Sequence, residues 1–579
     1  MSMRIALAQL NPVSGDIDGN TDKVVRAIAD AARGGADMVV APEMVLPGYC
    51  IGDLIEDRAF LDANERAMQR VARAARDITA IVGFIDCDYS ARSDTGTIRK
   101  FNAGAVVRDG HVLQRARKTL LPNYRYFDDK RFFTPAEERE PVDLTVRGGH
   151  ARIGVSICED LWDDYYDVKP LTELTAQGAA VLFNINASPF YPGKRHERDA
   201  LIRRQLHQLR RPLVYVNTVG AADNGKNIIP FDGESLVYDA GGRLIAVGRQ
   251  FEEDLLMVDL DGREHPQVDL PPIERERELY ESLMMTLRDY MQKTGFTRAT
   301  VAVSGGIDSA LVLALAADAL GPANVNGFNM PSKFNTETTK SIAQRLCANF
   351  GVRYGVIPIQ GIGDAVISVF EHHAHPITSN LTRENLQARI RGLLMMAESN
   401  DTGALLISCG NETEIALGYA TLYGDMCGGI SLIGDLSKTD VYQLARYVNQ
   451  RHGTEKIPAD AFTVVPSAEL ADGQFDPFDY AVVAPIVGEL VERRTSPAEL
   501  VSRFEHRELD RTRFLPDADG RTVYDKHTPA SFRKVVDDAS RRTRRSVYKR
   551  LQGPPIVAVS ERAFGFDLRE TIINGWQGD

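Results

Sequence analysis

Short apolar runs rich in β-branched residues alternate with amphipathic stretches along nearly the whole chain, and the alternation is interrupted once. Between residues 3 and 260 the runs include RIALAQL, RIGVSICED and AVLFNINAS. Residues 261–273 then hold one glycine and three prolines, which favour a break. After the break, ATVAVSGG, NVNGFNMP, VRYGVIPI and ALLISCGN are each followed by a helical pattern. This arrangement predicts two layered α/β units.

We place the first domain at residues 1–262, a linker at 263–275 and the second domain at 276–579. In the second domain the regular succession of strand and helix is typical of parallel strands with crossover helices, which indicates a doubly wound sheet. Hairpin-like pieces late in the first domain favour a mixed sheet there. A chain of 579 residues is long enough for both cores.

The net charge and the hydropathy of the chain limit the kinds of partner that it can bind. The chain has 68 Lys plus Arg against 80 Asp plus Glu, a net charge of −12, which argues against broad capture of nucleic acid or of an anionic membrane. The richest apolar stretch, 310–320, is shorter than the ~20 residues that span a bilayer. No signal peptide pattern precedes the first strand, and the six cysteines contain no CxxC pair. We therefore expect a soluble, cytoplasmic protein.

The sequence SGGIDS, residues 304–309, stands between a predicted strand and a predicted helix. Its two glycines let the backbone approach a phosphate, and the helix N-terminus favours an anion. The lysine of a GxxxxGK[ST] loop is absent. The motif resembles the pyrophosphate-binding loop of the N-type ATP pyrophosphatases, which implies an adenine nucleotide alpha hydrolase-like fold. It also implies that Asp308 is a ligand of Mg²⁺, a cation that prefers carboxylate oxygen.

Further motifs follow in the order found in NAD synthetases: ENLQARIRG, GNETEIALGYATLYGD, LSKTDVY, PSAEL and YKR. The second half of the chain thus resembles that family. The resemblance, with our own assignment of Lys438, implies ATP contacts from Ala302, Val303, Ser304, Gly305, Gly306, Ile307, Asp308, Ser309, Cys409, Lys438 and Ser467. It implies contacts to deamido-NAD, among which Arg389 is again our own assignment, from Asn385, Arg389, Glu414 and Lys549. Glu414 is then the second Mg²⁺ ligand.

Two positions depart from the family pattern. Glu412 stands where members frequently have lysine, and Leu422 stands where small single-domain members often have lysine. Which side chains neutralise the negative charge of the substrates at these positions is therefore open. A run of histidines, His372, His373 and His375, lacks partner cysteines and lies outside every motif, so we do not expect it to bind metal. Because no GxGxxG follows a strand, we expect no redox cofactor.

Three residues of the first half, Glu43, Lys118 and Cys158, each lie at or just after a predicted strand. In order and context they resemble the catalytic triad of the nitrilase superfamily, which implies an α-β-β-α sandwich. A cysteine is only slightly ionised at neutral pH, so Glu43 would take its proton as it attacks an amide. The fixed charge of Lys118 would stabilise the oxyanion that forms.

Tyr124, Ser188 and Lys194 correspond to positions that bind the amino-acid end of L-glutamine in the glutaminase domains of NAD synthetases. Asp129 stands where many nitrilases have a supporting glutamate, so its assignment is open. The resemblance also implies a homo-oligomer formed through the synthetase domains.

Together the two resemblances imply that ammonia released at Cys158 reacts with adenylated deamido-NAD, giving NAD, AMP and pyrophosphate, and that a channel carries the ammonia. Three alternatives stay open: a nitrilase-type amidase with a degenerate second domain, an ATP-sensing module without turnover, and an adenylating amidotransferase for another carboxylate. Release of pyrophosphate that depends on ATP would exclude the first two.

Overall fold

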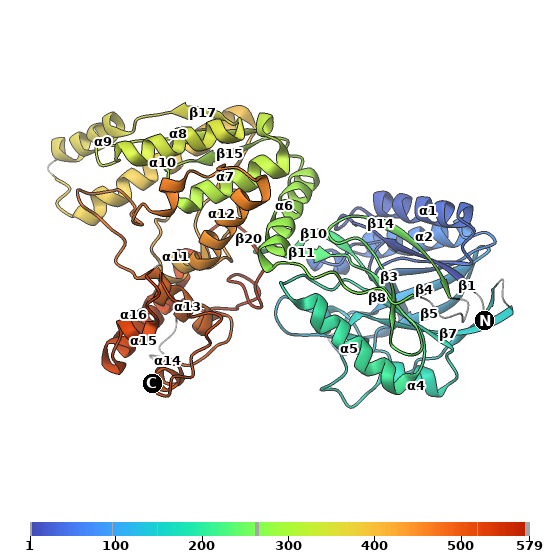
Figure 1. Cartoon of the computed structure of the whole chain (residues 1–579). Helices are drawn as coiled ribbons and strands as arrows, with labels where there is room; N and C mark the ends of the chain where they lie inside the picture. Colours follow the sequence, from blue (N-terminus) through green and yellow to red (C-terminus); the bar gives the residue numbers. More distant parts are fainter. Residues whose placement is uncertain are drawn as a thin grey trace. The chain divides into compact units, whose positions relative to one another are not determined.

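The structure is a computed structural model that describes residues 3–94, 96–146, 149–260, 266–373, 375–517 and 519–573. It contains two compact units (Figure 1). The first comprises Met1–Asn224 and Ile229–Ile273, and the second comprises Gly225–Ile228 and Glu274–Asp579. Residues 261–265, where we placed the end of the first domain and the start of the linker, lie outside the described residues. The domain boundaries stay a prediction.

Two six-stranded sheets form the middle layers of the first unit, in the orders β14-β1-β2-β3-β4-β5 and β13-β12-β9-β8-β7-β6. Helices α1 and α2 cover the first sheet, and α4 and α5 cover the second. The predicted α-β-β-α sandwich is confirmed. The elements are β1 Met3–Gln9, α1 Ile17–Arg33, β2 Met38–Val40, η1 Gly52–Glu56, α2 Arg58–Ala74, β3 Thr79–Arg92, β4 Ile98–Arg108, β5 His111–Arg117, α3 Asp129–Phe132, β6 Val142–Val146, β7 Gly149–Ile157, η2 Cys158–Leu161, α4 Pro170–Ala176, β8 Val181–Asn186, α5 Lys194–Leu209, β9 Leu213–Asn217, β10 Val219–Asp223, β11 Asn227–Asp232, β12 Leu236–Tyr238, β13 Leu244–Val247 and β14 Asp254–Leu260.

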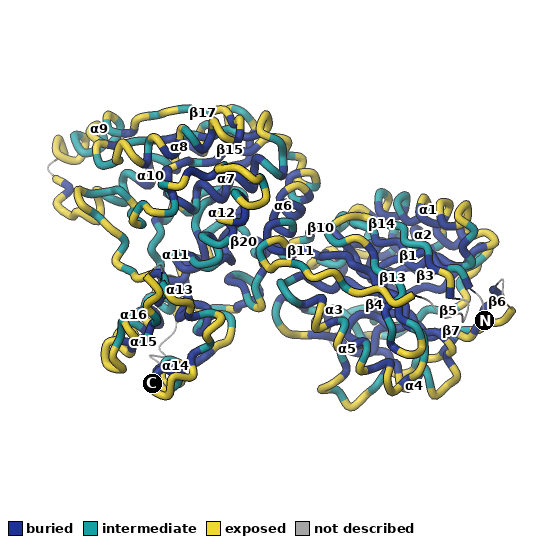
Figure 2. Tube along the Cα trace, in the orientation of Figure 1, coloured by how far each residue is buried: buried dark blue, intermediate teal, exposed yellow. Residues whose placement is uncertain are grey.

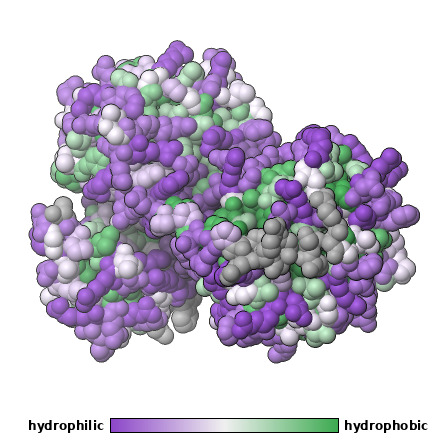
Figure 3. Space-filling model, turned by 45° about the vertical axis from the view of Figure 1, so that its right-hand side comes forward, coloured by the Kyte–Doolittle hydropathy of each residue, from purple (hydrophilic) through white to green (hydrophobic). Residues whose placement is uncertain are grey.

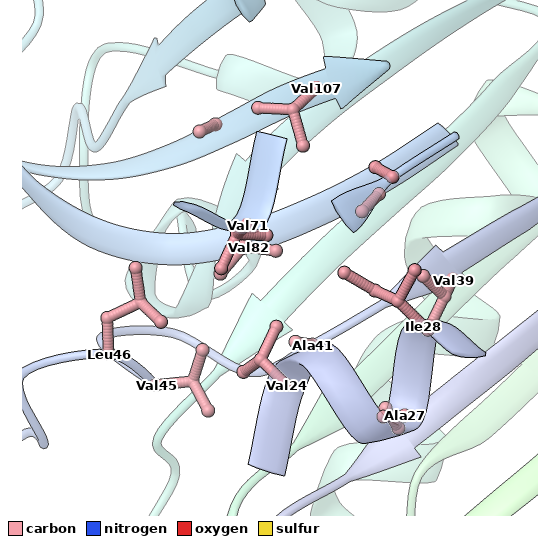
Figure 4. Close-up of a cluster of buried hydrophobic side chains, with 14 of the residues drawn as sticks. Val24, Ala27, Ile28, Val39, Ala41, Val45, Leu46, Val71, Val82 and Val107 are labelled. Carbon is pink, nitrogen blue, oxygen red and sulfur yellow. The ribbon is translucent and has the colours of Figure 1, made fainter. Parts of the chain in front are cut away.

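The core between the first sheet and its helices is made mostly of aliphatic side chains (Figure 4). Val24 and Ile28 lie on one face of α1 because they are four residues apart, and they pack toward Val39 and Val82 of the sheet. A second cluster fills the space between the two sheets. Each sheet therefore packs against helices on one face and against the other sheet on its second face.

The second unit is built on a parallel sheet in the order β20-β19-β18-β15-β16-β17, to which Asn227 and Ile228 add by pairing with β20. The chain runs outward from β15 to β17 and then returns to β18 on the other side of β15. The predicted doubly wound sheet is confirmed. The elements are α6 Arg275–Thr294, β15 Ala299–Ala302, α7 Ile307–Leu320, η3 Pro322–Asn324, β16 Val325–Asn329, α8 Glu337–Phe350, β17 Arg353–Val356, α9 Gln360–His372, α10 Asn380–Thr402, β18 Leu405–Ser408, α11 Glu412–Leu417, β19 Ile430–Ser431, α12 Lys438–His452, η4 Ala459–Phe462, α13 Tyr480–Val491, α14 Pro497–Glu505, α15 Val523–Lys526, α16 Pro529–Arg545, α17 Val547–Arg550 and β20 Ile556–Val557.

The most apolar stretch of the sequence is α7, which is buried almost all round inside the second unit, whereas α9 has no buried residue (Figure 2). Within the described ranges no helix is both long and apolar enough to cross a membrane. The face seen in Figure 3 is mostly hydrophilic, with smaller apolar areas between.

Two candidate active sites

Cys158 lies where β7 turns into a short 3₁₀ helix. Its φ is +43°, in the left-handed region that residues other than glycine rarely adopt. The carboxylate of Asp160 holds this turn, because it accepts hydrogen bonds from the backbone N–H groups of Ile157 (3.0 Å), Thr119 (3.0 Å) and Leu120 (2.8 Å). The thiol is therefore fixed to the segment that follows Lys118. Strain of this kind is common at active sites.

The other two predicted triad residues are in direct contact. Lys118 Nζ donates to Glu43 Oε1 and to Asp129 Oδ2, both at 2.7 Å, and the Lys118 and Glu43 side chains have no exposed surface. Glu43 also accepts from Asn102 Nδ2 at 2.7 Å and from the backbone N–H of Ala187 at 2.8 Å. Burial alone lowers the pKa of Lys118, but the charges of Asp129 and Glu43 outweigh it and raise that pKa well above its ordinary value. Lys118 is thus a fixed cation.

The thiol of Cys158 is protonated at rest. Burial, followed by the negative charge of Glu43, raises the pKa of Cys158 well above its ordinary value, and Lys118 opposes this only in part. A protonated thiol needs a base before it can attack an amide, and Glu43 is the anion that acts most strongly on it. Asp129 also accepts from Tyr49 Oη at 2.8 Å, so it holds Lys118 in place.

The predicted glutamine contacts lie around the same residues. Tyr124 Oη donates to Glu159, the neighbour of Cys158, at 2.9 Å. Ser188 is buried, and Lys194 begins α5, where burial lowers the pKa of Lys194 to about 8. Sequence reasoning missed Glu159, since an acidic residue beside the nucleophile has no distinctive spacing. A carboxylate there can bind an ammonium group.

In the second unit, the carboxyl ends of β15 and β18 lie side by side where the strand order reverses, the usual position of ligand crevices in such sheets. A cavity of about 310 Å³ opens there. The predicted residues that line it are Ala302, Val303, Ser304, Gly306, Ile307, Asp308, Ser309, Cys409, Glu414, Lys438 and Ser467. Gly305 has φ +93°, and a Cβ on it would lie 2.1 Å from the carbonyl oxygen of Thr339, so only glycine fits.

Asp308 and Glu414 face one cation. Lys438 Nζ lies 2.5 Å from Asp308 Oδ2 and 3.1 Å from Glu414 Oε1, and Asn411 Nδ2 donates to Asp308 Oδ1 at 2.8 Å. Burial raises the pKa of Glu414 to about 7, against the effect of Lys438. Two carboxylates that converge on one point fit Mg²⁺, which takes its other ligands from water and phosphate. In the described ranges no three His, Cys, Asp or Glu side chains form a metal-binding group.

Asn385, Arg389 and Lys549, which we assigned to deamido-NAD, do not line this cavity. They converge instead on residues 418–422: Asn385 Oδ1 accepts from Thr421 Oγ1 (2.7 Å), Arg389 Nε donates to the carbonyl of residue 422 (3.2 Å), and Lys549 Nζ donates to the carbonyls of residues 418 (2.9 Å) and 420 (2.8 Å). The cavity wall contains Arg391 and Glu469 in addition, which sequence reasoning missed.

Glu412, the first departure from the family pattern, is buried, and neither of its carboxyl oxygens has a hydrogen-bond partner among the described atoms. Burial, then the charge of Glu492, raises the pKa of Glu412 well above its ordinary value. Burial therefore favours the neutral carboxylic acid at this position over an extra anion beside Glu414.

Glu412→Gln is expected to raise the melting temperature at pH 7. The pKa of Glu412 is higher in the folded protein than in the unfolded chain. The free energy of unfolding of the wild-type protein therefore falls as the pH rises above ~4.5, by at most about 3 kcal/mol at pH 7. The gain should shrink toward pH 5, as calorimetry at the two pH values will show. Glu505→Gln, on an exposed position, is the control; a variant less stable than wild type at pH 7 contradicts the interpretation.

Residues 4–266 match the carbon-nitrogen hydrolase family, and residues 279–515 match the NAD synthase family. Fold and site thus define the class, a nitrilase-superfamily unit fused to an ATP pyrophosphatase-type unit. The chain is 36% identical to a glutamine-dependent NAD(+) synthetase of Thermotoga maritima, in an alignment that covers 99% of this chain and 98% of the relative. It is 34% identical to a glutamine-dependent NAD(+) synthetase of Acinetobacter baylyi, in an alignment that covers 100% of this chain and 99% of the relative. The chain belongs to the family of glutamine-dependent NAD(+) synthetases.

Solved structures agree. A glutamine-dependent NAD+ synthetase from Acinetobacter baumannii, solved in complex with ADP, covers 100% of both chains with 30% identity and a TM-score of 0.73. One from Cytophaga hutchinsonii shares the fold with a TM-score of 0.80 at 21% identity, over 99% of this chain and 98% of the other.

Proposed function

We propose that the chain makes NAD from deamido-NAD, ATP and L-glutamine, with release of AMP, pyrophosphate and L-glutamate. Membership of the synthetase family over the full length supports this proposal. The single observation that carries it is that both sites are built, with Glu43 and Lys118 in contact in one unit and Asp308 and Glu414 converging in the other. A degenerate second domain would not keep the latter pair.

In the first unit, Glu43 takes the proton of Cys158 as sulfur attacks the amide carbon of glutamine. Lys118 stabilises the oxyanion, and Glu43 returns the proton to the departing nitrogen, so that ammonia leaves and a thioester remains on Cys158. Water hydrolyses the thioester to glutamate. Glu159 and Tyr124 hold the amino-acid end of the substrate, together with Ser188 and Lys194.

In the second unit, the backbone of residues 302–309 holds the phosphates of ATP. Mg²⁺, held by Asp308 and Glu414 when it is bound, supplies positive charge to those phosphates. The nicotinate carboxylate of deamido-NAD attacks the α-phosphorus, and pyrophosphate leaves. Ammonia then displaces AMP from the adenylate. Contacts of the ATP ligand extend to Cys409 and Ser467, and contacts of deamido-NAD to Asn385, Arg389 and Lys549.

Ammonia passes from one site to the other without mixing with the solvent, where at neutral pH most of it would be protonated and unreactive. The active protein is a homo-oligomer joined through its synthetase domains.

Glutamine labelled with ¹⁵N at the amide, supplied together with an equal concentration of unlabelled ammonium, is expected to give NAD that carries mainly ¹⁵N. Mass spectrometry of the NAD and chromatography of AMP are the measurements. No AMP with deamido-NAD present would overturn the function, AMP with a different carboxylate would change the substrate, and NAD labelled only to the level of the mixed ammonia would overturn the direct transfer.

A further inference from the structure

Two cationic side chains, Lys438 and Arg391, stand among the residues that line the cavity of the second unit. Lys438 is neutralised by Asp308 and Glu414. Arg391 forms no ion pair within the part of the chain that the structure describes; its Nε donates to the carbonyl of Met330 at 3.0 Å, and its Nη2 donates to Asn335 Oδ1 at 3.3 Å. Among the described residues that line the cavity, Arg391 is therefore the cation that no carboxylate contacts directly, although the negative charges of Glu469 and Asp425 act on it.

Burial lowers the pKa of Arg391 to about 10, so the guanidinium is still charged at neutral pH. A buried cation that no carboxylate contacts directly is unfavourable, and an anion that enters the cavity can supply that contact. Both bonds of Arg391 go to neutral acceptors, and a guanidinium has five N–H donors in a planar fork. Donors remain for a ligand.

The side chain of Asn335 fixes the position of that fork. Asn335 Nδ2 donates to Glu469 Oε2 at 2.7 Å, and Asn335 Oδ1 accepts from the backbone N–H of Ser332 at 2.8 Å and from Arg391. Because the amide nitrogen is engaged by Glu469, the amide oxygen must face Arg391. Glu469 thus sets the orientation of Asn335 and, through it, of Arg391.

Glu469 also fastens this group to the phosphate loop. It accepts from Thr339 Oγ1 at 3.1 Å, and the carbonyl of Thr339 packs directly against Gly305. The backbone N–H of Glu469 donates to Ser467 Oγ at 3.0 Å. The φ of Glu469 is +47°, a strained value that these anchors maintain.

We propose that Arg391 binds the polyphosphate of ATP and that Glu469 is a positioning residue that aims Arg391 through Asn335. The proposal rests on the proposed synthetase function, since ATP is taken from there. Arg391, on α10, would thus bind the phosphates in addition to the N-terminus of α7 and to the metal held by Asp308 and Glu414. Its contacts lie on the side of the cavity that residues 330–339 and 466–470 form.

Arg391→Ala is expected to raise KM for ATP by about 10- to 100-fold with kcat within about threefold, the size expected when a charged contact to phosphate is lost. Calorimetric titration with inorganic tripolyphosphate should show the same loss of affinity, whereas titration with adenosine should show none. Loss of adenosine affinity instead, or unchanged tripolyphosphate affinity, overturns the proposal. Binding of tripolyphosphate does not require turnover, so this test of Arg391 can fail while the proposed function holds, and the reverse.

Arg383→Ala is the matched control. Arg383 lies on the same helix, and its Nη2 donates to the carbonyl of residue 377 outside the cavity, so its KM for ATP should equal that of wild type. The thermal unfolding of every variant, compared with wild type, reports whether the second unit is folded.

Glu469→Gln keeps the shape of the side chain but can no longer accept from every one of its donors, so Asn335 is free to turn. KM for ATP is expected to rise by about three- to tenfold, in line with one weakened hydrogen bond. In the double variant with Arg391→Ala no further rise is expected, because Glu469 acts through Arg391. Additive effects would show that Glu469 acts elsewhere, and would overturn its positioning role.

Discussion

Cys158→Ala is expected to lose glutamine-dependent NAD formation by at least about 10³-fold, the scale seen when a nucleophile is removed. NAD formation from ammonium chloride should stay within about twofold of wild type. The reason is that the thiol and its partners belong to the first unit, whereas adenylation needs only residues of the second. NAD formation with each nitrogen source, at saturating ATP and deamido-NAD, is the measurement.

Cys87→Ala, in β3 of the same unit, controls for the loss of a thiol and should keep both activities. Equal loss of both activities in a folded Cys158→Ala protein would show that the two reactions are not divided between the units as proposed.

Glu414→Gln is expected to reduce AMP formation by about 100-fold or more, since one of two carboxylates at the proposed metal site becomes a neutral amide. Hydrolysis of glutamine should continue. Raising the Mg²⁺ concentration should recover part of the activity, because the remaining carboxylate of Asp308 binds the cation more weakly alone. AMP release measured across a series of Mg²⁺ concentrations tests this.

The same substitution two residues earlier gives the control. Glu412 is buried, its pKa is raised, and it does not line the cavity, so Glu412→Gln should make AMP at the wild-type rate and with wild-type Mg²⁺ dependence. If the two variants lose AMP formation alike, the loss comes from the fold of α11 rather than from the metal site.

Sequence periodicity was sufficient to predict two α/β units and the doubly wound sheet of the second, because buried parallel strands are continuous apolar runs and each crossover helix has its own pattern. The sandwich of the first unit was predicted from the resemblance to the nitrilase superfamily. The catalytic candidates could be predicted because their order, context and placement at strand ends resemble the nitrilase triad, although each residue alone is uninformative. Contacts of single side chains could not. On α10, Arg389 and Arg391 are two residues apart and so point to different sides of the helix, and only the structure shows that Arg391 lines the cavity.

Long-range context was equally invisible in the sequence. Nothing near Glu412 in the chain indicates that Glu492, eighty residues on, raises its pKa. Similarly, no local signal shows that Asp129 and Tyr49 share a hydrogen bond. The roles of the site residues stay predictions until the variants are measured.

The placement of Gly225–Ile228 in the second unit has a consequence for synthesis on the ribosome. Asn227 pairs with Ile556, and its side chain bonds the backbone of Phe564 and Phe566. At roughly 5–20 residues per second, these partners emerge some 20–60 s after Asn227. Until they emerge, the pairing of Asn227 with Ile556 cannot form, and this part of the second unit stays incomplete. Because the chain crosses between its units more than once, we expect halves of the chain that are expressed separately to fold incompletely.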